Sequence, residues 1–94
     1  MIGGFSANEI DDSAREAWAA ALSNQNHPTN WATGKNWTLN SVETQVVAGT
    51  NYWFHVTSDQ GEKRSVKVFV PLPHTNEKAY VTQECEGHQP AGCC

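Results

Sequence analysis

The residues with the most obvious reactive chemistry lie at the end of the chain, where Cys85, His88, Cys93 and Cys94 fall within the last ten residues. Thiolates and imidazoles bind zinc, and four of them could complete a tetrahedral site. Their spacing matches no standard zinc knuckle, so we expect neither a metal ion nor another cofactor; zinc binding by this tail is an alternative. Because the cysteine count is odd and Cys93 and Cys94 are adjacent, we expect reduced thiols, as in the cytosol.

Catalytic groups show no recognisable grouping elsewhere. His27, His55 and His74 fall in different segments of the chain, and no serine or cysteine lies in a nucleophile signature. We therefore expect that the protein is not an enzyme. The triplet Asn36-Trp37-Thr38 matches a glycosylation sequon, which would matter only in a secreted protein.

The composition limits the classes of partner. The 94 residues are 38% hydrophobic and 17% charged, with a formal net charge of −4, so the chain offers no basic patch for nucleic acid or anionic membrane. No run approaches the roughly 20 apolar residues of a membrane span. Residues 1–6 lack the basic region and apolar stretch of a signal peptide. These features predict a cytoplasmic protein whose partners are proteins or small molecules.

A helix is predicted near the N-terminus. Ser6 and Glu9 fit a capping box, in which the Ser6 hydroxyl accepts from the Glu9 amide and the Glu9 carboxylate from the Ser6 amide, so the helix should begin there. Apolar residues then recur at helical spacing over about five turns. They are Ile10, Ala14, Ala17, Trp18, Ala21 and Leu22. The helix should end near Ser23 and Asn24, because Pro28 follows.

From Trp37 onward the pattern is typical of β-strands. Four segments alternate or are rich in β-branched and aromatic residues: 37–48, 52–57, 65–70 and 79–82. A change of parity predicts a bulge between Leu39 and Val42. One helix followed by about four strands with short links predicts an α+β domain with the helix across one face of an antiparallel sheet. The domain should span residues 1–83, and residues 84–94, rich in Gly, Pro and Gln, should form a flexible tail.

One hairpin tip has an unusual composition. The stretch QVVAGTNY, residues 45–52, carries two valines, an alanine and a glycine where turns usually carry Asn, Asp or Pro. An apolar tip is either buried in this molecule or meant for another one. The links at residues 47–50 and 72–74 are separated by two strands and a turn, so they should project from the same edge of the sheet.

These features resemble those of the cystatins, protein inhibitors of papain-like cysteine proteases. Residues 45–49, QVVAG, match the family's Q-x-V-x-G signature, and an N-terminal glycine, a helix and a Leu-Pro turn occur in the family's order. The chain is most similar to the stefins, which lack signal peptides and disulfides. It departs from them at His74, where a glycine is common, and in its cysteine-bearing tail.

The resemblance implies a cystatin-like fold, with one long helix packed across a four- to five-stranded antiparallel sheet. It also implies a monomer that binds papain-like cysteine proteases of the cathepsin type, reversibly and without a cofactor, by filling the active-site cleft. An N-terminal segment and two hairpin loops would make the contacts, with Ile2 offered to the apolar S2 pocket. The implied protease-binding residues are Ile2, Gly3, Gly4, Gln45, Val46, Val47, Ala48, Gly49, Leu72, Pro73 and His74.

Two alternatives concern the same edge of the sheet. A non-inhibitory binding module could use it for another protein. In addition, β-branched Val46 and Val47 lower the cost of opening the tip into one continuous strand, so two molecules could exchange the helix and its adjacent strand in a domain-swapped dimer.

Overall fold

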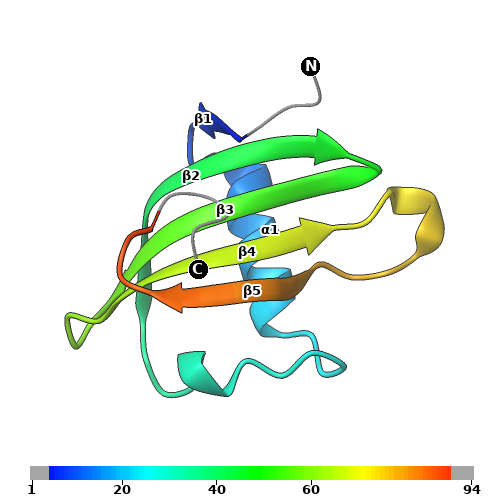
Figure 1. Ribbon diagram of the computed structural model, residues 1–94. Helices are drawn as coiled ribbons and strands as arrows, with labels where there is room; N and C mark the ends of the chain where they lie inside the picture. Colours follow the sequence, from blue (N-terminus) through cyan, green and yellow to red (C-terminus); the bar gives the residue numbers. More distant parts are fainter. Residues whose placement is uncertain (1–4, 90–94) are drawn as a thin grey trace.

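The computed structural model describes residues 5–89 as a five-stranded antiparallel sheet with one α-helix packed against one face (Figure 1). The strands lie side by side in chain order, β1 to β5. Their bounds are β1 Ser6–Asn8, β2 Trp37–Val47, β3 Gly49–Ser58, β4 Lys63–Val70 and β5 Tyr80–Glu86; helix α1 is Asp12–Leu22, and Asn30–Ala32 and Pro73–Thr75 are short 3-10 helices. This confirms the expected α+β architecture and adds a fifth, N-terminal strand.

The start of the helix differs from the prediction. The first helical residue is Asp12, and the Asp11 side chain caps the helix by accepting a 2.9 Å hydrogen bond from the amide of Ala14. Ser6 instead begins β1 and pairs with Thr44 on the edge of β2. The capping-box pattern was misleading because Ser and Asp are both good N-caps, and the pairing of β1 with β2 decides between them.

The helix is therefore shorter than predicted, with 11 residues and Ser23 as its C-cap, where its end was expected. Within residues 5–89 there is no helix with the length and apolar character needed to cross a bilayer.

The strands meet as the alternation predicts. The β2–β3 register shifts between Leu39 and Ser41, which confirms the expected bulge. A second shift, between Lys67 and Val68, separates the two halves of the β4–β5 pairing.

The core lies between α1 and one face of the sheet. Small residues on the helix, Ala14, Ala17 and Ala21, let it approach the strands closely, and the Trp18 ring packs edge-on against Phe54 with 5.3 Å between centroids. The sheet contributes fully buried side chains to the same core. They are Val42, Phe54, Val56, Val66 and Val68. Successive side chains of a strand point to opposite faces, so Trp53, Ser65 and Phe69 belong to the other face, called here the outer face.

The end of the domain also differs from the prediction. Strand β5 continues through Glu86, so the expected boundary at residue 83 falls inside it. Beyond β5, Gln89 is hydrogen-bonded to Trp53 and Ser65 on the outer face. A segment rich in polar residues therefore packs on the sheet here, because its backbone meets polar partners on the central strands.

Cys85 is disulfide-bonded, which corrects the expectation of reduced thiols at this position. The other two cysteines of the sequence, Cys93 and Cys94, lie outside the described residues. An odd number of cysteines is compatible with one disulfide, so it did not exclude the pairing of Cys85.

Candidate functional site

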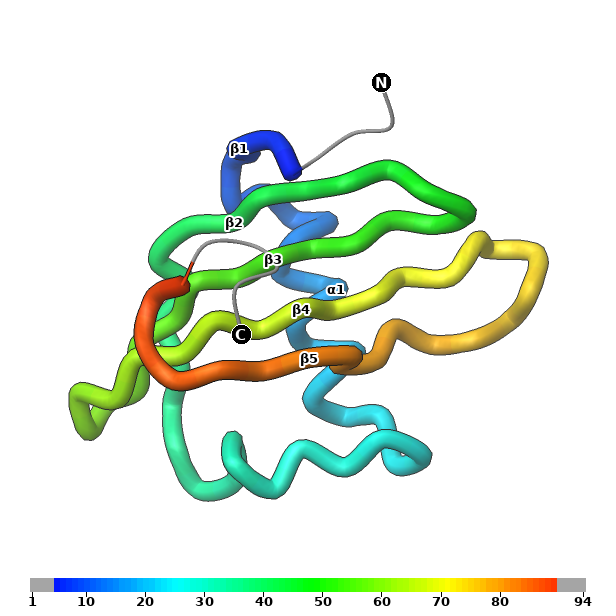
Figure 2. Tube along the Cα trace, in the orientation of Figure 1, coloured from blue at the N-terminus to red at the C-terminus, as the bar shows by residue number. Residues whose placement is uncertain are grey.

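The exposed apolar side chains point to one edge of the sheet. Among the described residues, the large hydrophobic side chains that stand exposed are Val46 (80%), Val47 (41%) and Leu72 (39%). Val46 and Val47 end β2, and Leu72 follows β4, so all three lie at the two links that project from the same end of the sheet (Figures 1 and 2). Exposed apolar groups that gather at one place are typical of a protein-binding surface. Residues 46–49 are called here the first tip, and residues 72–74 the second tip.

The first tip is a very tight reversal. Val47 pairs with Gly49, so Ala48 alone separates β2 from β3. Gly49 has a φ of +124°, and a Cβ atom there would lie 2.5 Å from the carbonyl oxygen of Val70 and 2.8 Å from the Phe69 ring. Only glycine allows this conformation and this close approach. The first tip therefore rests on the end of β4.

Gln45 stabilises the strand pair at the base of the first tip. Its Oε1 accepts a 3.0 Å hydrogen bond from the Nδ2 of Asn51, across the β2–β3 pair. Asn51 is buried, so this contact holds the two strands together immediately before the reversal. Gln45 thus acts on the shape of the tip through Asn51.

The second tip is closed by its own hydrogen bonds. The Thr75 amide and hydroxyl both donate to the carbonyl of Leu72, at 3.0 and 2.8 Å, and the Asn76 amide donates to the carbonyl of Pro73 at 3.2 Å. Asn76 adopts a left-handed conformation, with φ of +56°, that ends the short helix. This turn leaves the Leu72 and His74 side chains exposed.

The predicted N-terminal contacts cannot be placed in the same way. Ile2, Gly3 and Gly4 lie outside the described residues. The described chain begins at Phe5, whose ring packs against Trp53 with 6.4 Å between centroids. The next residue, Ser6, pairs with Thr44, three positions before Val47 on the adjacent strand.

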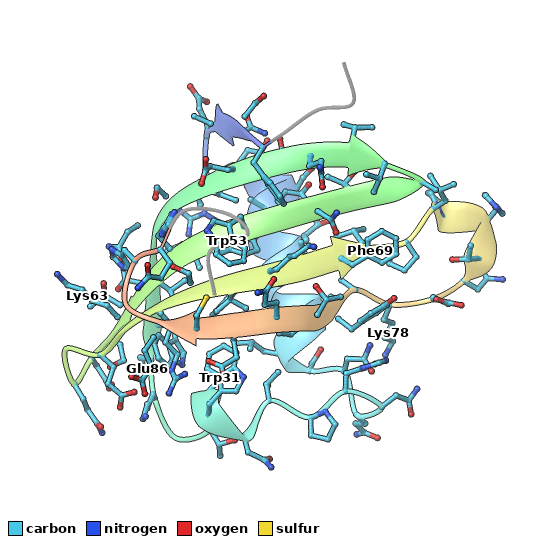
Figure 3. The ribbon with its side chains drawn as sticks, viewed as in Figure 1. Trp31, Trp53, Lys63, Phe69, Lys78 and Glu86 are labelled. Carbon is cyan, nitrogen blue, oxygen red and sulfur yellow. The ribbon has the colours of Figure 1, made fainter. Side chains whose placement is uncertain are left out.

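Sequence reasoning missed the contact of Phe69 with the first tip. Phe69 lies on the outer face of the sheet, next to the first tip (Figure 3). Its ring packs edge-on against Tyr80 at 5.8 Å, and Tyr80 stacks on His27 at 4.4 Å. A row of contacts therefore joins the first tip, β5 and the link after α1. The β3–β4 register pairs Asn51 with Phe69, so knowledge of this register would have predicted that Phe69 lies near the first tip.

A row of polar groups on the outer face has the order of a nucleophile, a base and an acid. Ser65 Oγ lies 3.3 Å from Nδ1 of His55, and Nε2 of His55 lies 3.5 Å from a Glu43 carboxylate oxygen. However, Ser65 is fully buried, and its hydroxyl donates to the carbonyl of Gly87. The row therefore binds the end of the described chain, at Gly87, and presents no nucleophile to solvent.

A polar hollow of about 700 Å³ lies between the link after α1 and the segment before β5. Amide and charged side chains dominate its lining, which includes Asn24, Asn26, Glu77 and Lys78. It lacks the exposed apolar anchors of the tips. In the described part of the chain, no three side chains of the metal-binding type converge.

Comparisons of the chain with protein-family models, with curated proteins and with solved structures find no match. The function is therefore inferred from the chain's own residues and their geometry.

Proposed function

We propose that the protein is a cystatin-like, reversible and competitive inhibitor of papain-like cysteine proteases. The observation that carries the proposal is the position of Val46, Val47 and Leu72, the exposed large apolar side chains of the described residues, on two tips at one edge of the sheet. Gln45 and the first tip together have the QVVAG signature. The strand order β1 to β5, with the helix between β1 and β2, agrees with a cystatin-like fold.

The tips suit a cleft in both shape and charge. Among residues 45–51 and 71–76 the only ionisable side chain is that of His74, so entry into a cleft would remove few charged groups from water. Removal of the apolar side chains from water would contribute about 25 cal/mol of binding free energy per Å² of apolar surface buried. Both tips are held by hydrogen bonds or close backbone contacts before binding, which reduces the ordering cost of association.

Inhibition would follow from occlusion. The first tip reverses direction at Ala48, and a reversal of this tightness does not present an extended peptide as a substrate would. The catalytic thiolate then finds no scissile carbonyl in position for attack, although the cleft is filled. Ile2, Gly3 and Gly4 would complete the contact, since glycines let the backbone pass close to the enzyme without a side chain.

The direct test is titration of active papain with the protein. We expect a stoichiometric, reversible loss of activity that rising substrate concentration relieves. Full papain and cathepsin activity at a micromolar excess of the protein would overturn the proposal.

The non-inhibitory binding module is the second candidate, because the same exposed edge would serve another protein partner. It predicts no effect on papain and a saturable partner whose binding is lost in Val47→Asp. A monomer is expected in either case. The alternative is a domain-swapped dimer whose fraction rises with protein concentration. Size-exclusion chromatography after mild heating measures the fraction of dimer.

A further inference from the structure

The start of β2 carries the one glycosylation sequon of the sequence, Asn36-Trp37-Thr38. An asparagine followed two residues later by serine or threonine is the acceptor of N-linked glycans, provided that the middle residue is not proline. Such triplets arise often by accident, so the position of this one in the fold decides whether it is informative. Asn36 lies immediately before β2, and Thr38 is the second residue of that strand.

The two side chains that define the sequon are exposed. Asn36 and Thr38 lie at the surface, whereas the Trp37 side chain between them is partly buried and packs against the core. This alternation is that of an extended chain, in which successive side chains point to opposite faces. A glycan on Asn36 would therefore enter water and displace no packed group.

The backbone around the acceptor is fixed from the inner side. The Trp37 indole N–H donates to the carbonyl of Ala32 at 3.3 Å, and the Trp37 ring packs edge-on against Trp31 with 5.6 Å between centroids. The Asn36 carbonyl accepts from the amide of Asp59 at 2.9 Å. These contacts use the main chain and the middle residue of the sequon, and they leave the Asn36 amide group at the surface.

The side-chain contact of Asn36 is compatible with modification. Its Nδ2 lies 3.4 Å from a carboxylate oxygen of Asp59, in an exposed pair near the upper limit for a hydrogen bond. A glycosylated amide nitrogen keeps one of its two N–H groups, so it can still donate to Asp59. Glycosylation would therefore break no buried hydrogen bond.

The state of Cys85 agrees with the compartment in which sequons are used. Cys85 is disulfide-bonded. Disulfides form and persist in the secretory pathway and outside the cell, and they are rare in the cytosol. The expectation of a cytoplasmic protein depended in part on reduced thiols, so the disulfide removes that support. The sequon and the disulfide are separate observations, at β2 and β5, that are consistent with the same compartment.

We propose that Asn36 is an N-glycosylation site and that the chain passes through the secretory pathway, where the glycan is added. The co-substrate is an oligosaccharide linked to a lipid pyrophosphate. Nδ2 of Asn36 forms a bond to the anomeric carbon of the sugar, and the bond from that carbon to the pyrophosphate breaks. The lipid pyrophosphate leaves with the electron pair, and the amide nitrogen gives one proton to the solvent. This inference does not depend on the proposed function.

The site lies at the end of β2 opposite the first tip (Figure 1). The 11 residues of β2 separate Asn36 from the first tip, which corresponds to about 35 Å of extended strand. The second tip lies at the same end of the sheet as the first. A glycan on Asn36 would therefore leave both tips free, and we expect protease inhibition to be independent of it.

The first measurement uses the endogenous protein, isolated with an antibody against the domain. Peptide N-glycosidase releases the glycan and converts the acceptor asparagine to aspartate. Tandem mass spectrometry should therefore find aspartate at position 36 after treatment with the glycosidase. Endogenous protein with an unmodified Asn36 before treatment would overturn the proposal.

The second measurement uses the full chain secreted from eukaryotic cells behind a cleavable signal sequence. We expect a glycosidase-sensitive increase in apparent mass that is lost in Asn36→Gln and Thr38→Ala and kept in Thr38→Ser, because the sequon needs the hydroxyl. Asn40→Gln is the matched control, since Asn40 is an exposed asparagine of the same strand that lies in no sequon. A secreted chain without a glycan, or a glycan that persists in both Asn36→Gln and Thr38→Ala, would overturn the proposal.

Inhibition assays distinguish this inference from the proposed function. Glycosylated and deglycosylated chains should inhibit papain equally, because the glycan lies at the far end of β2. If both forms are inactive against papain while Asn36 is glycosylated, the proposed function is wrong and the glycosylation site stands. Inhibition that appears only after the glycan is removed would overturn the expected independence of the two sites.

Discussion

The position that a Cβ atom of Gly49 would occupy lies 2.8 Å from Cζ of Phe69, so the first tip lies directly against the strand that leads to the second tip. Phe69 is in turn packed edge-on against Tyr80, at the start of β5 on the far side of the second tip. Phe69 therefore links the first tip to β4 and β5, the strands on either side of the second tip. The proposed insertion of both tips into one cleft would need such a connection.

Gly49→Ala should damage both stability and inhibition. Its φ of +124° is far from the left-handed minimum near about +57° that other residues tolerate, and the new methyl group would meet the Val70 carbonyl oxygen at 2.5 Å. We expect a loss of about 3 kcal/mol in the free energy of unfolding, from backbone strain and overpacking together, and a faster papain off-rate.

Gly61→Ala is the matched control. Gly61 also has a positive φ, +83°, but a Cβ atom there has nothing within 4 Å, and the residue lies in the β3–β4 link, away from both tips. It should cost only about 1 kcal/mol in urea unfolding and leave the papain off-rate unchanged. Equal effects of the two substitutions on the off-rate would show that the contact of Gly49 with β4 does not shape the binding edge.

Val47→Asp should remove inhibition without unfolding the domain. Val47 is exposed at the end of β2, so the free energy of unfolding should change by less than about 0.5 kcal/mol. A carboxylate at the centre of a dried interface should weaken papain binding by about 100-fold or more, as loss of a hot spot does. The inhibition constant and a urea titration measure the two effects.

Thr38→Asp provides the comparison, because Thr38 is exposed on the same strand at the end opposite the first tip. It adds the same charge and should leave inhibition unaltered. If Thr38→Asp weakened inhibition as much as Val47→Asp, net charge and not the tip would be responsible.

The features that the sequence could predict depend on residues that are close together in the chain. The parity change at Leu39 predicted the bulge, Pro28 predicted the end of α1, and the apolar composition of residues 46–49 marked a tip whose valines are exposed. Each depends on residues close together in the chain. Local rules on turns, alternation and helix termination were sufficient for them.

The features that sequence could not predict depend on distant pairings. β1 is too short to show alternation, and it forms because the edge of β2 accepts it. Phe69 reaches Gly49 through the β3–β4 register, and the buried hydroxyl of Ser65 donates to the carbonyl of Gly87, which lies beyond β5. A buried hydroxyl needs hydrogen-bond partners, so the serine within the valine-rich run of β4 was the available signal for this contact.

The helix caps give a direct test of that difference. Asp11→Ala should lower the free energy of unfolding by about 1 kcal/mol, because the amide of Ala14 loses its acceptor. Ser6→Ala should have little effect, since Ser6 is exposed in β1 and outside α1. Urea unfolding followed by circular dichroism compares the two variants. A larger loss of unfolding free energy for Ser6→Ala than for Asp11→Ala would mean that Ser6 caps the helix.

Tyr52 should make the protein less stable at alkaline pH. Burial raises the pKa of Tyr52 above its usual 10.0, and the nearby Asp11 carboxylate raises it further. Below the pKa of the unfolded chain both states keep the phenolic proton, so stability does not depend on it. As the pH rises from that value through the pKa of the folded state, the unfolded state releases the proton first, and the free energy of unfolding falls.

Two variants separate the causes of this alkaline loss. Tyr52→Phe should remove the part of the decline above about pH 10 that comes from this phenol. Asp11→Asn keeps a good helix cap but removes the charge, so the Tyr52 phenolate absorbance should appear at a lower pH than in the unaltered protein. Because desolvation is the larger cause, the pKa of Tyr52 should stay raised in Asp11→Asn. A return to the ordinary tyrosine value would mean that the Asp11 carboxylate, and not burial, dominates.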